Sequence, residues 1–149
     1  AGMLIFVRDR DYSGLLRAVQ GRKVAVWTCN TCARLCNGIG GTEAAERLAE
    51  ALRRDGTDVI GVRSVSASCL EDKVCARLEK EPLDEADLLI SLACDSGSSC
   101  VARLSCKEVI NPLITLGRGY LSKDNVPVLT QNGYSEEYAR GKDGSDPFV

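Results

Sequence analysis

Three short apolar runs in the middle of the chain each lead to a cysteine, and this pattern constrains the fold more than any other feature. The runs are residues 24–27, leading to Cys29, residues 59–62, leading to Cys69, and residues 88–93, leading to Cys94. Runs of this length are typical of buried strands. Because amphipathic stretches separate them, the sequence predicts strands alternating with helices, which is the pattern of a parallel sheet.

The stretches between the runs predict the helices. We expect Thr42 to be the N-cap of the first, and Gly56 to end it. Its apolar positions recur at the spacing of one helical face: Ala45, Leu48, Ala49 and Leu52. Further helices are expected at 72–80 and at 98–106, the second capped by Ser98 after a turn at 95–97.

The ends of the chain extend this prediction. A fourth strand is expected from Val109, and a fifth at 126–129, which Pro127 would place at an edge. The N-terminal segment predicts a strand at 3–7 and a helix at 12–19. The predicted fold class is α/β, an open, mostly parallel Rossmann- or flavodoxin-like sheet of four to five strands with cysteines at their carboxyl ends. Residues 1–130 form a single α/β cluster-binding domain in this interpretation, and residues 131–149 a polar tail.

Composition narrows the chemistry. The chain has 8 cysteines and no histidine, so Ser-His-Asp and Cys-His catalysis and all His-ligated metals are excluded. With 19 basic and 21 acidic residues, the net charge of −2 argues against nucleic acid as a partner. No stretch has the length of an apolar membrane span and none has the pattern of a signal peptide, so we expect a cytoplasmic chain with no membrane partner.

Eight cysteines in a reducing compartment favour metal or cluster ligands, with redox thiols and disulfides or inert core residues as the alternatives. Cys29, Cys32 and Cys36 follow one another at spacings that suit a [4Fe–4S] cluster. The glycines after this run, Gly38, Gly40 and Gly41, would let backbone amides approach the sulfurs. The same glycines also fit a loop leading into a helix, or a phosphate cradle.

The predicted sheet places the cysteines relative to one another. If the first strand is central, Cys29 lies between Cys69 and Cys94 at the carboxyl edge, with Cys32 or Cys36 as the fourth ligand of one cluster. The remaining thiols, with Cys75, Cys100 and Cys106, would hold a second cluster. One cluster with spare cysteines fits the inventory equally well, and Cys75 and Cys106 also fit the role of small core residues.

Two other uses of sulfur stay open. Zinc is an alternative to iron, although a zinc site made of four cysteines usually comes from two Cys-x-x-Cys pairs, and only Cys29 and Cys32 have that form. A thiol–disulfide oxidoreductase using Cys29 and Cys32 is the other, because this pair follows a strand as in thioredoxins. That interpretation leaves the other six cysteines unexplained.

The order of these motifs resembles the methylenetetrahydrofolate reductase C-terminal domain family, which is similar to the small subunit of the acetogen-type reductases. The resemblance covers roughly residues 23–117. The matching positions are Cys29, Cys32, Cys36, Gly40, Gly41, Cys69, Cys94 and Gly97, and more loosely Asn111, Pro112, Leu113, Leu116 and Gly117. Cys75, Cys100 and Cys106 are additions to that pattern.

The resemblance implies a function. Subunits of this family bind iron–sulfur clusters or zinc and pass electrons to a flavin-containing TIM-barrel reductase. The expectation is therefore a non-catalytic electron-transfer subunit of an oxidoreductase in one-carbon metabolism of an anaerobe. It would carry one or two [4Fe–4S] clusters, or zinc, and bind the flavin-containing subunit and further electron-transfer subunits. Because the chain has only 2 Phe, 1 Trp and 4 Tyr, we do not expect the flavin itself to bind here.

Overall fold

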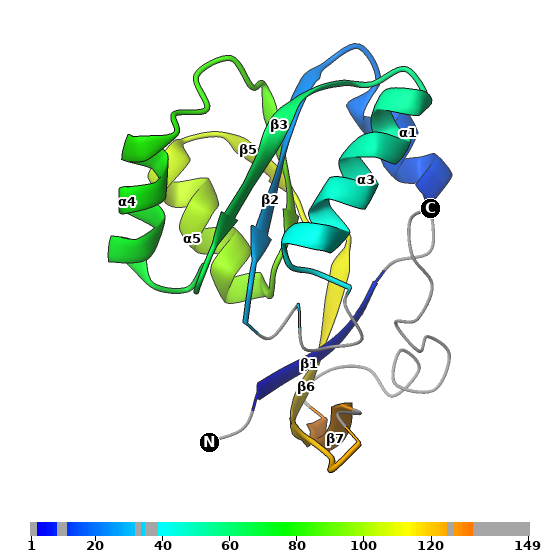
Figure 1. Cartoon of the computed structure of the whole chain (residues 1–149), viewed down its shortest axis with the longest axis vertical. Helices are drawn as coiled ribbons and strands as arrows, with labels where there is room; N and C mark the ends of the chain where they lie inside the picture. Colours follow the sequence, from blue (N-terminus) through cyan, green and yellow to red (C-terminus); the bar gives the residue numbers. More distant parts are fainter. Residues whose placement is uncertain (1–2, 9–11, 32–33, 35–38, 125–126, 133–149) are drawn as a thin grey trace.

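The computed structural model describes residues 3–8, 12–31, 34, 39–124 and 127–132, and these residues form two sheets. The larger sheet is parallel, with the strand order β3–β2–β4–β5 (Figure 1). Its strands are β2 (Lys23–Cys29), β3 (Asp58–Val65), β4 (Leu88–Leu92) and β5 (Glu108–Ile110). The predicted open parallel α/β fold is confirmed, and so is the central place of β2 between β3 and β4.

Helices cover both faces of this sheet, as right-handed crossovers require. One face carries α1 (Tyr12–Val19) and α3 (Thr42–Arg54), and the other carries α4 (Glu71–Lys80) and α5 (Asp95–Ser105) (Figure 1). Alternate residues of β2 and β4 point to opposite faces, so each face has its own buried cluster. Val26 of β2 packs with the α3 side and Trp27 with the α4–α5 side.

Two predicted helix starts are wrong. The N-cap of α3 is Gly41 and not Thr42, because the backbone there takes φ 91°, a left-handed conformation suited to glycine. Thr42 is the first helical residue, and its amide donates to Asn30 Oδ1 at 3.0 Å. Likewise, α5 begins at Asp95, because Cys94 and not Ser98 caps it. The residues expected to form a turn at 95–97 are therefore the first turn of this helix.

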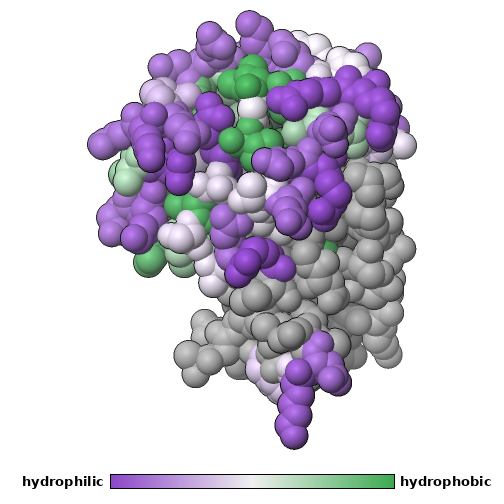
Figure 2. Space-filling view, in the orientation of Figure 1, coloured by the Kyte–Doolittle hydropathy of each residue, from purple (hydrophilic) through white to green (hydrophobic). Residues whose placement is uncertain are grey.

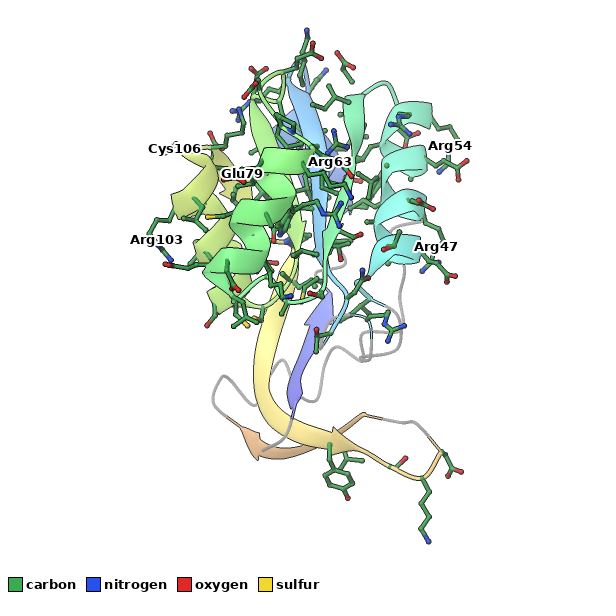
Figure 3. All side chains as sticks on the ribbon, turned by 60° about the vertical axis from the view of Figure 1, so that its left-hand side comes forward. Arg47, Arg54, Arg63, Glu79, Arg103 and Cys106 are labelled. Carbon is green, nitrogen blue, oxygen red and sulfur yellow. The ribbon has the colours of Figure 1, made fainter. Side chains whose placement is uncertain are left out.

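The second sheet is antiparallel and has the order β1–β6–β7. Its strands are β1 (Met3–Arg8), β6 (Leu113–Leu121) and β7 (Pro127–Asn132). It lies beyond the carboxyl ends of the parallel strands, so that β6 runs out of the α/β body (Figures 1 and 3). The strand expected at 126–129 is an edge strand, as Pro127 predicts, but it belongs to this sheet because it pairs with β6. Within the predicted tail, residues 131 and 132 belong to β7, and residues 133–149 lie outside the described part.

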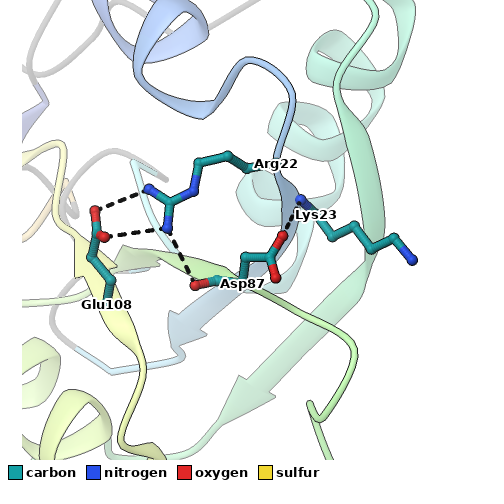
Figure 4. Close-up of polar contacts among 4 residues, drawn as sticks. All are labelled: Arg22, Lys23, Asp87 and Glu108. Carbon is teal, nitrogen blue, oxygen red and sulfur yellow. Dashed lines mark hydrogen bonds and ion pairs between the residues drawn. The ribbon is translucent and has the colours of Figure 1, made fainter.

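A polar contact joins three strands at the opposite, amino end of the parallel sheet (Figure 4). The guanidinium of Arg22, just before β2, pairs with both carboxylate oxygens of Glu108 in β5, at 3.2 Å each. Between them, Asp87 accepts a hydrogen bond from the Lys23 amide through its carboxylate and from Arg22 through its carbonyl. The amino edge is therefore closed by ionic and backbone contacts, whereas Cys29 and Cys94 lie at the carboxyl edge.

The face of the molecule drawn in Figure 2 is mostly hydrophilic over its described residues. Figure 2 shows small apolar patches between hydrophilic side chains on the face that carries β3, the edge strand of the parallel sheet. Among the described large hydrophobic side chains, Leu70 and Tyr120 are the exposed ones, at 48% and 52%. None of the described helices combines the length and the apolar character needed to cross a membrane.

Candidate thiol site at the carboxyl edge of the sheet

Two cysteines end neighbouring strands of the parallel sheet. Cys29 is the last residue of β2, and Cys94 follows β4 by two positions. The strands are paired in register up to Thr28 and Leu92, so both thiols lie where adjacent parallel strands finish. Cys29 is buried, with 8% of its surface exposed, and Cys94 is partly buried. The sequence prediction of thiols at this edge is confirmed for these two residues.

Cys94 has a second role as the N-cap of α5. Its Sγ accepts a hydrogen bond from the amide of Gly97 at 3.4 Å, the position that Ser or Asp oxygens take in most helix caps. A helix N-terminus favours the thiolate over the thiol, and amide N–H···S bonds lower the electron density on a ligating sulfur. Cys94 is therefore placed where a negative sulfur is stabilised by the backbone.

The loop between β3 and α4 contacts Cys29 and also α5, the helix that Cys94 caps. The Sγ of Cys29 lies 3.9 Å from the carbonyl oxygen of Ser66. Two residues on, the Ser68 hydroxyl accepts from Trp27 Nε1 at 2.9 Å and donates to the Gly97 carbonyl at 2.8 Å. Ser68 is fully buried, so this hydroxyl fixes the loop against both β2 and α5.

The close contact of this loop with α5 depends on a glycine. A Cβ atom at Gly97 would lie 2.9 Å from Ser68 Cβ and 3.3 Å from Ala93 Cβ. No side chain fits there without a shift of the loop. The Cys94-x-x-Gly97 spacing thus has a physical reason, since Gly97 supplies the amide for Cys94 and the space for Ser68.

Asn111 links the carboxyl edge to the antiparallel sheet. Its Nδ2 donates to the carbonyl of Ala93 at 3.0 Å, and its Oδ1 accepts from the amide of Leu113 at 2.9 Å. Ala93 directly precedes Cys94, and Leu113 is the first residue of β6. Both ends of the Asn111 amide are therefore used, one by each sheet.

Cys69, in the loop before α4, and Cys75, in α4, both lie close enough to Cys100 of α5 to interact with it electrostatically. Cys100 is buried at 5% exposure, whereas Cys69 and Cys75 are exposed. Burial is the largest cause that raises the pKa of the Cys100 thiol, while Arg103 lowers it and Glu71, Cys69 and Cys75 raise it further. Cys100 was expected close to a helix start capped by Ser98. Because α5 begins at Asp95, it lies in the second turn and belongs to the buried cluster of this face.

Cys106 lies apart from these residues. It is exposed at the C-cap of α5, with φ 58°, and Figure 3 shows it at the end of the helix away from the carboxyl edge. Its Sγ lies 3.7 Å from the carbonyl oxygen of Arg103. The structure therefore gives Cys106 a local capping position at the other end of α5.

Three predicted site residues, Cys32, Cys36 and Gly38, lie outside the described residues. Gly40 and Gly41 are buried where the chain enters α3, and the Gly41 amide donates to Thr28 Oγ1 at 2.7 Å. A cavity of about 550 Å³ beside them is lined by Asn30, Arg34, Gly40, Thr42, Glu43, Ala44 and Arg47. Because the Gly41 amide already has a partner, the structure gives this glycine the role of leading into α3.

The described residues bring together two thiols at the carboxyl edge and three at the α4–α5 contact. Among the described residues of the chain, no group of three or more cysteine or acidic side chains is arranged so that it could hold a metal ion. The donor set is nevertheless one of soft thiols, the type that iron–sulfur clusters and zinc take. A complete ligand set at the carboxyl edge therefore requires cysteines from the remainder of the chain.

Sequence reasoning missed Ser66 and Ser68, which position these thiols, and named Asn111 only as a loose match to the family pattern. Ser66, Ser68 and Asn111 carry no metal-binding signal, because hydroxyl and amide side chains are common in any loop. Two local signals were present: Ser68 directly precedes Cys69, and Gly97 follows Cys94 at N-cap spacing. No protein-family model, curated protein or solved structure matches the chain.

Proposed function

We propose that the chain is an iron–sulfur electron-transfer subunit that delivers electrons to a flavoprotein reductase. The observation that supports this most directly is that Cys29 and Cys94 lie at the carboxyl ends of two neighbouring strands. These thiols end neighbouring parallel strands and contact segments that the Ser68 hydroxyl holds together. Ligand sites of open α/β sheets form at this edge.

In this proposal, Cys29 and Cys94 are two ligands of a [4Fe–4S] cluster, and the sequence supplies Cys32 and Cys36 as the others. This assignment departs from the sequence prediction, in which Cys69 was a ligand with Cys32 or Cys36 as the fourth, because Cys69 lies close enough to Cys100 to interact with it. When bound, the cluster supplies a one-electron centre. The chain's own residues hold it: the Gly97 amide stabilises negative charge on Cys94, and the buried side of β2 shields Cys29 from water.

The partner in this proposal is a flavin-containing TIM-barrel reductase subunit in the cytoplasm. Two arguments support it: the resemblance to the small subunit of methylenetetrahydrofolate reductase, and the scarcity of aromatic side chains with which this chain could stack a flavin. In native extract the chain should copurify with a flavoprotein, and the reduced chain should bleach that flavin's absorbance. A monomer that catalyses a reaction alone would contradict the proposal.

Metal analysis of anaerobically purified protein tests the cofactor. We expect brown protein with about four irons per chain, because Cys106, one of the four remaining thiols, lies at the other end of α5. About eight irons would instead indicate a second cluster on the remaining thiols. Stoichiometric zinc without iron after anaerobic reconstitution would favour a structural zinc module. Metal-free protein with a titratable Cys29–Cys32 disulfide would favour a thiol–disulfide oxidoreductase.

Paired substitutions test the site. Cys29→Ser and Cys94→Ser should each remove or convert the same EPR signal, because both residues ligate one cluster. Cys106→Ser is the matched control and should leave that signal unchanged, since Cys106 lies at the other end of α5. If Cys29→Ser abolishes a signal that Cys94→Ser leaves intact, the shared cluster is wrong.

A further inference from the structure

We propose that Cys69 and Cys100 form a reversible disulfide across the contact between α4 and α5, by exchange with a low-molecular-weight disulfide of the glutathione type. This pair lies outside the ligand set proposed above. Its formation does not depend on the proposed function.

The first argument is the close contact at Ser68. The Ser68 hydroxyl donates to the Gly97 carbonyl at 2.8 Å, and an added Cβ at Gly97 would lie 2.9 Å from Ser68 Cβ. Cys69 is the next residue in the loop, and Cys100 is one helical turn after Gly97 on the same side of α5. The backbone of the loop and the helix therefore approach closely next to both thiols.

An ion pair between α4 and α5 lies on the other side of Cys69 and Cys100. Glu71 in the first turn of α4 forms an ion pair with Arg103 of α5, with 2.6 Å between Oε1 and Nη1. Arg103 follows Cys100 by three residues, so Gly97, Cys100 and Arg103 share one side of the helix. Cys69 and Cys100 thus both lie between the Ser68–Gly97 contact and the Glu71–Arg103 contact.

The contacts favour Cys75 less than Cys69 as the disulfide partner of Cys100. It is exposed, and it follows Glu71 by four residues along α4, so it lies one turn beyond the ion pair. Cys69 precedes Glu71 and directly adjoins the contact made by Ser68. Although Cys100 interacts with both thiols, the fixed contacts favour Cys69.

The two thiols differ in their exposure to solvent, as stepwise thiol–disulfide exchange requires. Cys69 is exposed, and its neighbour Leu70 has 48% of its surface exposed, so an incoming reagent can reach Cys69. Cys100 is 5% exposed, and burial raises the pKa of its thiol. An external disulfide therefore reacts first at Cys69, and Cys100 reacts only with a sulfur that is already bound beside it.

The exchange balances in two steps. The Cys69 thiolate attacks one sulfur of the external disulfide, forms a mixed disulfide and releases one small thiolate, which takes up a proton. The Cys100 thiol then loses its proton and attacks the Cys69 sulfur, which forms the internal disulfide and releases the second small thiolate. Two protein thiols are oxidised, and one external disulfide is reduced to two thiols.

Such a bond would join the loop at Cys69 to α5 covalently. The same loop contacts the Cys29 sulfur through Ser66 and the indole of Trp27 through Ser68. The redox state of the pair would therefore change how firmly the loop is held next to the carboxyl edge.

Peptide mapping provides the test. The full chain, purified anaerobically, is treated with oxidised glutathione, alkylated and digested with trypsin, while its iron is measured in parallel. Cleavage after Lys and Arg places Cys69 in peptide 64–73, Cys75 in 74–77, Cys94 and Cys100 in 81–103, and Cys106 in 104–107. We expect a link between 64–73 and 81–103, with fragment ions assigning it to Cys100 and reversal by dithiothreitol.

Matched variants decide the assignment. Cys69→Ser and Cys100→Ser should each abolish this link, whereas Cys75→Ser and Cys106→Ser should retain it. A predominant link from 74–77 to 81–103 would overturn the pairing. So would a link to Cys94, or Cys69 found only as a mixed disulfide. Because the link is read by mass and the cluster by iron content, the two proposals fail separately.

Trp27 supplies a measurement that does not depend on digestion. It is the single tryptophan, it is fully buried, and it donates to the hydroxyl of Ser68, next to Cys69. Since disulfides quench nearby indoles, the emission of Trp27 should fall on oxidation and recover on reduction in the wild type and in Cys75→Ser. An equal change in Cys69→Ser would contradict the proposal.

Discussion

The two faces of the parallel sheet differ in chemistry although the same strands supply both. The buried cluster on the α1 and α3 side consists only of aliphatic side chains. The cluster on the α4 and α5 side includes Trp27 and Cys100, and next to it lie the buried hydroxyls of Ser68, Ser91 and Ser98. Ser91 of β4 and Ser98 of α5 are hydrogen-bonded to each other at 2.8 Å.

The difference shows how one strand serves two purposes. Because alternate residues of β2 point to opposite faces, Val24 and Val26 complete the aliphatic cluster while Ala25 and Trp27 face the other side. Cys29 is the next residue of the second series. Both faces thus bury apolar side chains that stabilise the fold, and the α4 and α5 face in addition positions thiols through the hydrogen bonds of Ser68 and Gly97.

Leu48→Ala should have the largest effect on stability. Leu48 is 1% exposed in the aliphatic cluster, and removing its side chain leaves a cavity that should cost about 2–5 kcal/mol in the free energy of unfolding. Denaturant unfolding measures this. If the two faces are separate in function, the EPR signal and the Cys69–Cys100 link persist in the folded variant; their selective loss would refute the division.

Ser68→Ala should have an intermediate effect, on the other face. It leaves the fully buried Trp27 indole N–H without its partner and removes the hydrogen bond that ties the loop to the Gly97 carbonyl, which should cost about 1–3 kcal/mol. It should also alter the emission of Trp27 and reduce the yield of the Cys69–Cys100 link, as peptide mapping would show. Thr57→Ala, at a site buried away from this loop, is a control that should leave the link unchanged.

Cys106→Gly should have the smallest effect on the free energy of unfolding, and it should stabilise the protein where the other two variants destabilise it. Among the described non-glycine residues, Cys106 is the one with positive φ, at 58°, which glycine adopts without a steric penalty. We expect a gain of at most about 1 kcal/mol in the free energy of unfolding, because relief of the left-handed conformation (about 1–2 kcal/mol) exceeds the entropy that glycine adds to the unfolded chain (about 0.4–1 kcal/mol). The iron content should be unchanged. A loss of iron would show that Cys106 belongs to the thiol chemistry after all.

The parallel sheet was predictable because short stretches of consecutive residues carry the patterns that indicate its strands and helices. Short apolar runs marked β2, β3 and β4, and the helical spacing of Ala45, Leu48, Ala49 and Leu52 marked α3. Helix starts were less predictable, since a residue outside the usual capping set, Cys94, caps α5.

The antiparallel sheet depends on pairing between distant segments, and local patterns do not encode this. Residues 3–7 were expected to be a strand, and β1 confirms it, but its partner β6 contains Gly117 and Gly119 and gave no strand signal. At the candidate site, the placement of Cys29 and Cys94 followed from the sheet. The hydrogen bonds of Ser68 did not, because a buried serine and an exposed one look alike in a sequence.

The amide of Asn111 has a mechanical consequence. The antiparallel sheet extends away from the body on β6, and the first residue of β6 donates to the same side chain that holds the carbonyl before Cys94. The start of β6 is thus joined to the sulfur-bearing end of β4 both by this amide and by the packing of Leu113 in the aliphatic cluster. Any molecule that binds the antiparallel sheet therefore binds next to the backbone that leads into Cys94.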